Sequence, residues 1–131
     1  MCSIFLEFNV DGIIISNTTI ERPFNGFGIN LKGGLSGRLL YQTSTDQLKK
    51  VYEKTKGKIP LIGVGGISSA KDAYNKIRNG ASLVQLYTGL VYQGPGLIKK
   101  INQEISVLLK NDGFDNIKDA VGIDTEIVND N

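Results

Sequence analysis

Three short apolar runs alternate with longer amphipathic stretches along this chain. Each apolar run is continuous, which is typical of strands buried on both faces of a parallel sheet. The runs predict strands over 12–16, 59–64 and 82–87. The amphipathic stretches repeat apolar residues three and four positions apart and predict helices over 45–56, 69–79 and 95–111, with a shorter helical piece over 116–121.

Residue types that favour helix ends support these boundaries. Ser44 is a candidate N-cap for the first helix, and Gly80 stands after the second helix, where a left-handed residue is common. Pro95 suits the first turn of the third helix, and Gly113 ends that helix. The polar residues from Gly122 onward are expected to fray.

The order of these elements predicts an α/β fold. Strands that alternate with helices favour a right-handed parallel array, and the second and third strands follow each other in a tight repeat. Three strands cannot close a barrel. A (β/α)8 barrel takes roughly 250 residues, whereas this chain has 131. The pattern is compatible with a small open sheet or with one end of a larger barrel.

Composition excludes several kinds of chemistry. The chain has no histidine and one cysteine, Cys2, so histidine triads, histidine metal sites, cysteine-cluster zinc sites and disulfide frameworks are excluded, and no metal is expected. Fifteen basic residues face 13 acidic ones, which leaves no strong field for nucleic acid. No apolar run approaches the roughly 20 residues of a membrane span, and the start of the chain lacks the basic region of a signal peptide.

The turn after the second predicted strand is the first candidate site. Gly65 and Gly66 lead from a buried strand into the Ser residues that begin a helix. Glycines let the backbone approach a ligand, and amides at a helix start can hold a phosphate. The alternative is a tight turn that needs positive φ. Tyr87 and Thr88 end the next strand with further donors, and neighbouring βα loops near the end of a barrel often form a phosphate site.

The first predicted strand ends in Ser16, Asn17 and Thr18. An asparagine at the carboxyl end of a strand offers a donor and an acceptor to a planar ligand, although a local Asx turn is the simpler interpretation. The glycines of 33–37 could lie beneath an aromatic ring system, or they could form a flexible hinge.

Several motifs in register resemble the C-terminal part of class 2 dihydroorotate dehydrogenase. They are Asn-Thr-Thr-Ile-Glu-Arg-Pro at 17–23, Gly-Gly-Leu-Ser-Gly at 33–37, Gly-Val-Gly-Gly-Ile at 63–67 and Gly-Ala-Ser-Leu-Val-Gln-Leu-Tyr-Thr at 80–88, followed by 92–95 and 112–114. The resemblance covers roughly 6–124. Leu39 departs from the pattern, because the family usually has proline there.

The resemblance implies a partial (β/α)8 TIM barrel, in which residues 1–131 supply strands six to eight and a C-terminal helix. It implies FMN as cofactor, oxidation of dihydroorotate to orotate in pyrimidine biosynthesis, and a membrane quinone as electron acceptor. It also implies membrane association, at the mitochondrial inner membrane in a eukaryote or at the cytoplasmic membrane face in a bacterium. No nucleic acid and no metal are expected as partners.

The resemblance also assigns site residues. FMN would contact Ser16 and Gly37, its phosphate would be held by Gly66, Tyr87 and Thr88 with Gly65 adjoining, and the substrate would bind Asn17 and Thr18. The family's serine base lies upstream, so no catalytic residue is expected here, and the chain alone is expected to be inactive and either only marginally folded or prone to aggregate. The alternatives are a catalytically silent half-barrel that binds flavin or phosphate, and a half-barrel that dimerises.

Overall fold

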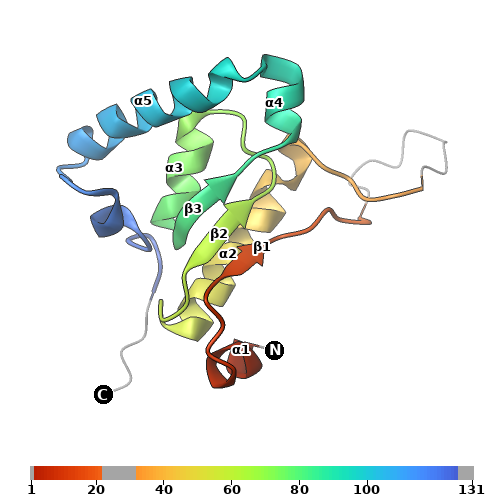
Figure 1. Cartoon of the computed structure of the whole chain (residues 1–131), viewed down its shortest axis with the longest axis vertical. Helices are drawn as coiled ribbons and strands as arrows, with labels where there is room; N and C mark the ends of the chain where they lie inside the picture. Colours follow the sequence, from red (N-terminus) through yellow and green to blue (C-terminus); the bar gives the residue numbers. More distant parts are fainter. Residues whose placement is uncertain (1, 22–31, 127–131) are drawn as a thin grey trace.

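The computed structural model describes residues 2–21 and 32–126. Its centre is a three-stranded parallel sheet in the order β1 (Ile13–Ile15), β2 (Leu61–Val64) and β3 (Ala81–Gln85) (Figure 1). Ile14 lies opposite Ile62, which in turn lies opposite Leu83, and a register shift between Leu61 and Ile62 marks an irregularity in the β2–β3 pair. The predicted parallel α/β fold is confirmed, and each strand is shorter than predicted.

Five α-helices and two 3-10 helices accompany this sheet in the described part of the chain. They are α1 (Cys2–Glu7), η1 (Arg38–Leu40), α2 (Tyr41–Thr55), α3 (Ala70–Arg78), α4 (Thr88–Gln93), α5 (Gly96–Asn111) and η2 (Ile117–Ala120). The sequence pattern did not predict α1. Within the described residues, no helix combines the length and the apolar character that crossing a bilayer requires.

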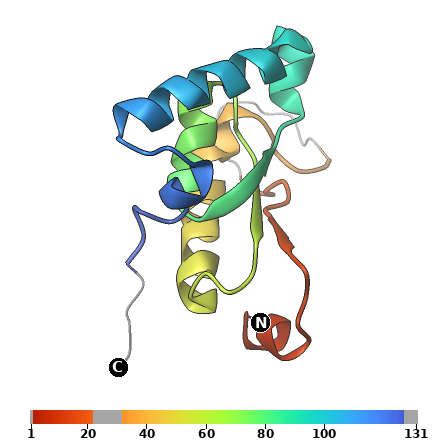
Figure 2. The same cartoon turned by 60° about the vertical axis from the view of Figure 1, so that its left-hand side comes forward.

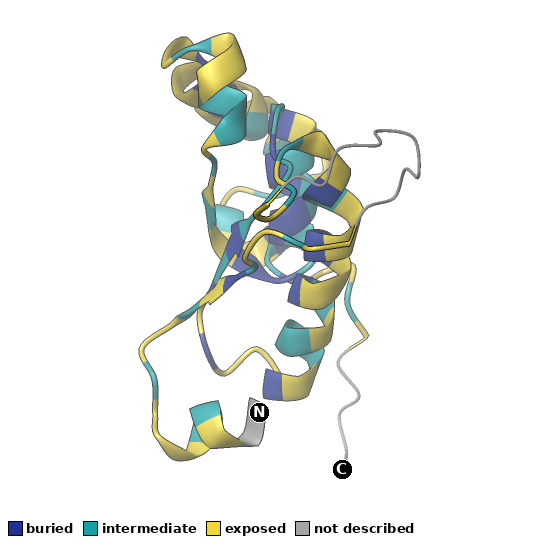
Figure 3. Ribbon diagram, turned by 90° about the vertical axis from the view of Figure 1, so that its right-hand side faces the viewer, coloured by how far each residue is buried: buried dark blue, intermediate teal, exposed yellow. Residues whose placement is uncertain are grey.

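The helices cover one face of the sheet. Ile15, Leu61 and Ala81 point to this face and pack against Leu48 of α2 in a buried cluster. On the opposite face, Ile14 is 57% exposed and Leu83 is 64% exposed. Figure 2 shows α2 and α3 on the same side of the strands, and Figure 3 shows the buried residues gathered where sheet and helices meet. Strands that are apolar on both faces are therefore buried on only one in this chain.

A second layer of core joins α3 to α5. Ile67 and Ala73 pack against Leu97 and Ile101, whereas Tyr74 and Ile77 pack against η2. The apolar stripes predicted for these two helices are the faces that meet. This contact fixes α3, and α3 in turn carries the Gly65–Gly66 turn at its N-terminal end.

The predicted N-cap at Ser44 is wrong. The helix begins earlier, at Tyr41, because η1 leads directly into it and Leu40 occupies the cap position. Ser44 is fully buried inside α2, where its hydroxyl lies 3.0 Å from the Tyr41 carbonyl and 3.1 Å from the Gly65 carbonyl. Because the Ser44 hydroxyl has acceptors at this buried position, Ser44 does not act as a helix cap.

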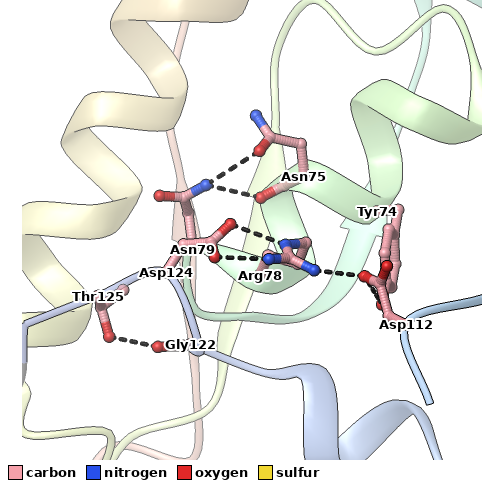
Figure 4. Close-up of polar contacts among 8 residues, drawn as sticks. All are labelled: Tyr74, Asn75, Arg78, Asn79, Asp112, Gly122, Asp124 and Thr125. Atoms are coloured by element: carbon pink, nitrogen blue, oxygen red, sulfur yellow. Dashed lines mark hydrogen bonds and ion pairs between the residues drawn. The ribbon is translucent and has the colours of Figure 1, made fainter. Parts of the chain in front are cut away.

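The prediction of a fraying tail from Gly122 is also wrong for residues 122–126. The Gly122 amide donates to the Ile77 carbonyl and the Asp124 amide to the Arg78 carbonyl, each at 3.0 Å. The Arg78 guanidinium bonds both Asp124 oxygens at 2.8 Å and also contacts Asp112 (Figure 4). This pairing lowers the pKa of Asp124. The polar residues are ordered because α3 offers them partners.

Candidate functional site

One open cavity of about 1140 Å³ lies at the carboxyl ends of the three strands. Its lining includes all eight residues predicted to bind cofactor or substrate: Ser16, Asn17, Thr18, Gly37, Gly65, Gly66, Tyr87 and Thr88. Among the residues that the structure describes, the lining also contains two basic residues, Arg38 and Lys100, and no acidic residue. The parallel topology explains this convergence, because the ends of adjacent parallel strands meet at one edge of the sheet. An open, positively charged cavity of this kind suits an anionic ligand.

The Gly65–Gly66 turn approaches α2 too closely for side chains. Gly65 and Gly66 have φ values of +110° and +73°. A β-carbon on Gly66 would lie only 2.4–2.6 Å from the Cβ, Cα and N atoms of Tyr41. Within the described residues, the amides of Gly66 and Ile67 donate to no protein acceptor. Two free amides in a turn without β-carbons can donate to phosphate oxygens.

The start of α3 is capped by its own side chains. The Ser69 hydroxyl accepts from the Asp72 amide at 3.1 Å, and the Asp72 carboxylate accepts from the Ser68 amide at 3.0 Å and the Ser68 hydroxyl at 2.9 Å. This arrangement resembles a capping box, except that the carboxylate at the third helical position accepts from Ser68, the residue before the N-cap, and not from the N-cap amide itself. Because it uses the Ser68 and Asp72 amides, the free donors of this turn are those of the glycine loop.

The end of β3 forms the adjoining wall. Tyr87 is the N-cap residue of α4 and is 79% exposed, and Thr88 begins that helix, as expected for a short helical turn there. The Thr88 hydroxyl lies 3.3 Å from the Ser36 hydroxyl, and a β-carbon on Gly37 would lie 3.3 Å from Thr88 Cγ2. The glycine-rich segment 33–37 is thereby held against the end of β3. The sequence did not single out Ser36.

The Ser16–Thr18 segment makes mostly local contacts. The Asn17 side-chain oxygen accepts from the Thr18 amide at 2.8 Å, which is a turn-like contact. Asn17 and Thr18 are nevertheless exposed on the cavity. A β-carbon on Gly34 would lie 1.9 Å from Thr18 Oγ1, so the glycine permits close contact between these two segments. The Arg22 and Pro23 end of the 17–23 motif lies outside the described residues.

Sequence reasoning missed a buried cation beneath the turn. Lys76 of α3 has 0% exposure, and its Nζ donates to Ser44 Oγ at 2.8 Å and to Thr45 Oγ1 at 3.0 Å. Burial lowers the pKa of Lys76 to about 8, and Asp72 and Asp46 partly oppose that shift. The sequence signal was present, because Lys76 stands three residues after Ala73, beside the apolar stripe of α3. Among the described residues, no group of acidic and sulfur ligands could hold a metal ion.

Comparison with known proteins identifies relatives of this chain. The family model described as dihydroorotate dehydrogenase matches residues 1–109. Dihydroorotate dehydrogenase (quinone) of Parvibaculum lavamentivorans is 51% identical over 97% of this chain and 37% of its own length. The mitochondrial dihydroorotate dehydrogenase (quinone) of Arabidopsis thaliana is 50% identical over 95% of this chain and 28% of its own length.

A solved structure is similar over the same region. The crystal structure of ligand-free DHODH from Eimeria tenella superposes with a TM-score of 0.88 and 39% identity, over 94% of this chain and 34% of that chain. This chain thus spans about a third of the length of the relatives it matches. On the family match and these identities together, the chain belongs to the dihydroorotate dehydrogenase family, among its quinone-dependent class 2 members.

Proposed function

We propose that this chain forms the FMN-phosphate side and part of the substrate site of a dihydroorotate dehydrogenase (quinone), an enzyme of pyrimidine biosynthesis that oxidises dihydroorotate to orotate. The observation that carries the proposal is the convergence of eight residues, named from family motifs, on one cavity. These residues come from three strand ends and an intervening loop, so their proximity depends on the fold.

The residues present fit a flavin mononucleotide. The loop at Gly65 and Gly66 has free amides and no β-carbons, and these features favour a phosphate group. Tyr87 and Thr88 offer further donors on the adjoining wall, and Ser16 and Gly37 line the part of the cavity left for the flavin. FMN, when bound, supplies the acceptor for the hydride that leaves the substrate.

The substrate subsite would use the exposed amide of Asn17 and the hydroxyl of Thr18. A side-chain amide can both donate to and accept from a pyrimidine ring, and a hydroxyl can donate to its carboxylate. These residues bind and orient the substrate, and neither is a proton acceptor at neutral pH. We therefore assign no catalytic base to this chain.

We also propose that residues 1–131 correspond to strands six to eight and the C-terminal helix of a (β/α)8 barrel. The row of Ile14, Ile62 and Leu83 supports this assignment, because it is apolar, lies on the face away from the helices, and leaves Ile14 and Leu83 more than half exposed. The electron acceptor would be a membrane quinone, with the enzyme membrane-associated, as the names of the mitochondrial and bacterial quinone-dependent relatives suggest.

A second candidate is a catalytically silent module that binds flavin or phosphate. It is favoured by the Gly66 and Ile67 amides, which donate to no protein acceptor among the described residues and could hold a phosphate group without any reaction following. Such a module would retain the Gly65–Gly66 loop, here called the phosphate loop, and would catalyse no reaction.

The purified chain mixed with FMN tests both candidates. We expect FMN absorbance to co-elute with the protein in gel filtration, and riboflavin, which lacks the phosphate, to be lost. Titration of the FMN-loaded chain with orotate then distinguishes the candidates, because only the first includes a substrate subsite at Asn17 and Thr18. A change in flavin absorbance on adding orotate that is lost in Asn17→Ala supports the first candidate, and FMN binding with no response to orotate identifies the silent module. Elution of free FMN at all protein concentrations would contradict both.

A further inference from the structure

Lys76 is the one lysine of the described chain whose whole side chain is buried. It extends from α3 toward α2 and passes close to β2. A β-carbon placed on Gly63 of β2 would lie 3.2 Å from Lys76 Cδ. Its Nζ lies 5.2 Å from the centre of the Tyr41 ring, which stabilises the positive charge. A buried ammonium is costly and needs partners, and the two hydroxyls of Ser44 and Thr45 are those partners.

The positive charge of Lys76 determines to which acceptors the hydroxyls of Ser44 and Thr45 donate. An ammonium has no lone pair, so both hydroxyls must accept from Lys76 and use their own hydrogens elsewhere. The Thr45 hydroxyl lies 2.7 Å from the Tyr41 carbonyl, which also accepts the backbone bond of the first turn of α2. The two lone pairs of that carbonyl are then occupied. The hydrogen of Ser44, which lies 3.0 Å from that occupied carbonyl, therefore goes to the Gly65 carbonyl at 3.1 Å.

The orientation of the Gly65 carbonyl sets the orientation of the next amide. The Gly65–Gly66 peptide is trans, and in a planar trans peptide the N–H points opposite to the C=O. With its carbonyl held toward Ser44, the peptide directs the Gly66 N–H away from Ser44. Ser44 does not line the cavity, whereas Gly66 does. The reversed peptide would turn a carbonyl oxygen toward a bound anion.

We propose that Lys76 is a positioning residue for the phosphate loop: its ammonium commits the Ser44 hydrogen to the Gly65 carbonyl and thereby directs the Gly66 amide at the phosphate of FMN. Lys76 acts through Ser44 and does not touch the ligand. This inference rests on the proposed function, because it assigns the phosphate to the Gly65–Gly66 loop.

Loss of the proton from Lys76 removes this constraint. A neutral amine has a lone pair and can accept from Ser44, which leaves the Gly65 carbonyl without its donor. The charged and titratable groups that face Lys76 are Asp72 from its own helix and Asp46 and Tyr41 from α2, while Gly63, its neighbour on β2, carries no charge. The two carboxylates favour the ammonium and burial opposes it, and together they place the pKa of Lys76 at about 8. FMN affinity should therefore decline as pH rises through 8.

The test is the equilibrium dissociation constant of FMN, measured by quenching of flavin fluorescence with the full chain between pH 7 and pH 9.5. We expect Lys76→Met to weaken FMN binding roughly tenfold or more at pH 7. A Ser44 hydroxyl that the ammonium no longer fixes can turn to the Tyr41 carbonyl at 3.0 Å, which frees the Gly65–Gly66 peptide to reorient and removes a hydrogen bond to the charged phosphate. Riboflavin binding should not change. The wild-type chain should lose FMN affinity by a similar factor around pH 8, and Lys76→Met should show no such dependence.

Lys71→Met is the matched control, because Lys71 is exposed on the same helix and the substitution removes the same charge. Its FMN affinity should stay within about twofold of the wild type. Ser44→Ala should reproduce the loss, and the double variant Ser44→Ala/Lys76→Met should be no worse than either single variant, because both act on one contact.

The outcomes separate this inference from the proposed function. If the wild-type chain binds no FMN at any pH, the proposed function fails and the role of Lys76 fails with it. If FMN binds and Lys76→Met leaves its affinity unchanged, only the role of Lys76 is overturned. If Lys76→Met does not fold by circular dichroism, the wild-type profile decides, because equal pH dependence for FMN and riboflavin contradicts a role directed at the phosphate.

Discussion

At the scale of single residues, the site depends on glycine at a position where a β-carbon would collide with neighbouring atoms. Gly66 combines a φ of +73° with a backbone neighbour at Tyr41, whereas Gly113 has a φ of +81° and nothing within 4 Å of the position of a β-carbon. Both glycines face the same backbone penalty on substitution, and only Gly66 adds a collision with α2. The pair therefore separates backbone strain from close approach.

We expect Gly66→Ala to destabilise the chain more than Gly113→Ala, which should cost only about 1–2 kcal/mol from the left-handed backbone. We also expect Gly66→Ala to weaken FMN binding at least tenfold, because the loop must move away from Tyr41. Urea unfolding and FMN titration measure the two effects. Equal losses of stability in the two variants would show that the contact with Tyr41 is unimportant.

The burial of Lys76 also predicts how the free energy of unfolding depends on pH. Its pKa is about 8 in the fold against an ordinary value of 10.5, so between these pH values the unfolded chain holds a proton that the folded chain has released. The free energy of unfolding should then rise with pH between 7.5 and 9.5, by roughly 2 kcal/mol. Lys76→Met should lack this rise and Lys71→Met should keep it, as urea titrations at each pH would show.

At the scale of elements, α3 organises the chain through its two ends. Its first turn is closed by Ser69 and Asp72 below the phosphate loop. Its last turn holds the C-terminal segment through Arg78, whose guanidinium bonds Asp124 and Asp112. The carbonyls of Ile77 and Arg78 also accept the amides of Gly122 and Asp124. The same helix therefore links the site to the end of the described chain.

We expect Asp124→Asn to lower the free energy of unfolding at pH 7 by about 0.2–1 kcal/mol, the range for partly exposed pairs. Because Arg78 lowers the pKa of Asp124, this stabilisation is present above the ordinary value of 3.8 and is lost as pH falls through the lower folded value. The two proteins should thus converge in acid. Asp115→Asn, at an exposed residue without an ion pair among the described residues, should behave as wild type.

At the scale of the whole molecule, the sheet is covered on one side. Ile14 and Leu83 flank Ile62 on the face without helices, and both are more than half exposed. Apolar groups left in water contribute little to stability and favour self-association. This arrangement supports the expectation of a chain that is marginal or aggregation-prone when isolated.

We expect Ile14→Thr/Leu83→Thr to change the free energy of unfolding by less than about 1 kcal/mol and to reduce self-association in light scattering. Leu61→Ala is the control, because Leu61 is fully buried on the opposite face and its truncation should cost about 2–5 kcal/mol. A large loss of stability in the double threonine variant would mean that the exposed face is buried in solution.

The sequence by itself determined the order and type of most elements, because continuous apolar runs and helical periodicity are local properties of the chain. It also predicted the Gly65–Gly66 turn and the positive φ at Gly80, since glycine is the residue that such backbone geometry favours. The eight site residues could be named only because motifs resembled a family. Spacing alone left Asn17 and the 33–37 glycines undecided.

The tertiary structure decided the features that depend on contacts between residues far apart in the sequence. Ser44 resembled a helix cap in sequence and became a buried partner of Gly65, because α2 packs against the loop. Residues 122–126 resembled part of a tail, and the described segment is held by contacts with Ile77 and Arg78 of α3. Lys76 was not singled out by the sequence pattern and is buried beneath the site. A polar side chain can follow the same local pattern in water or in a core, and only its distant partners determine which environment it occupies.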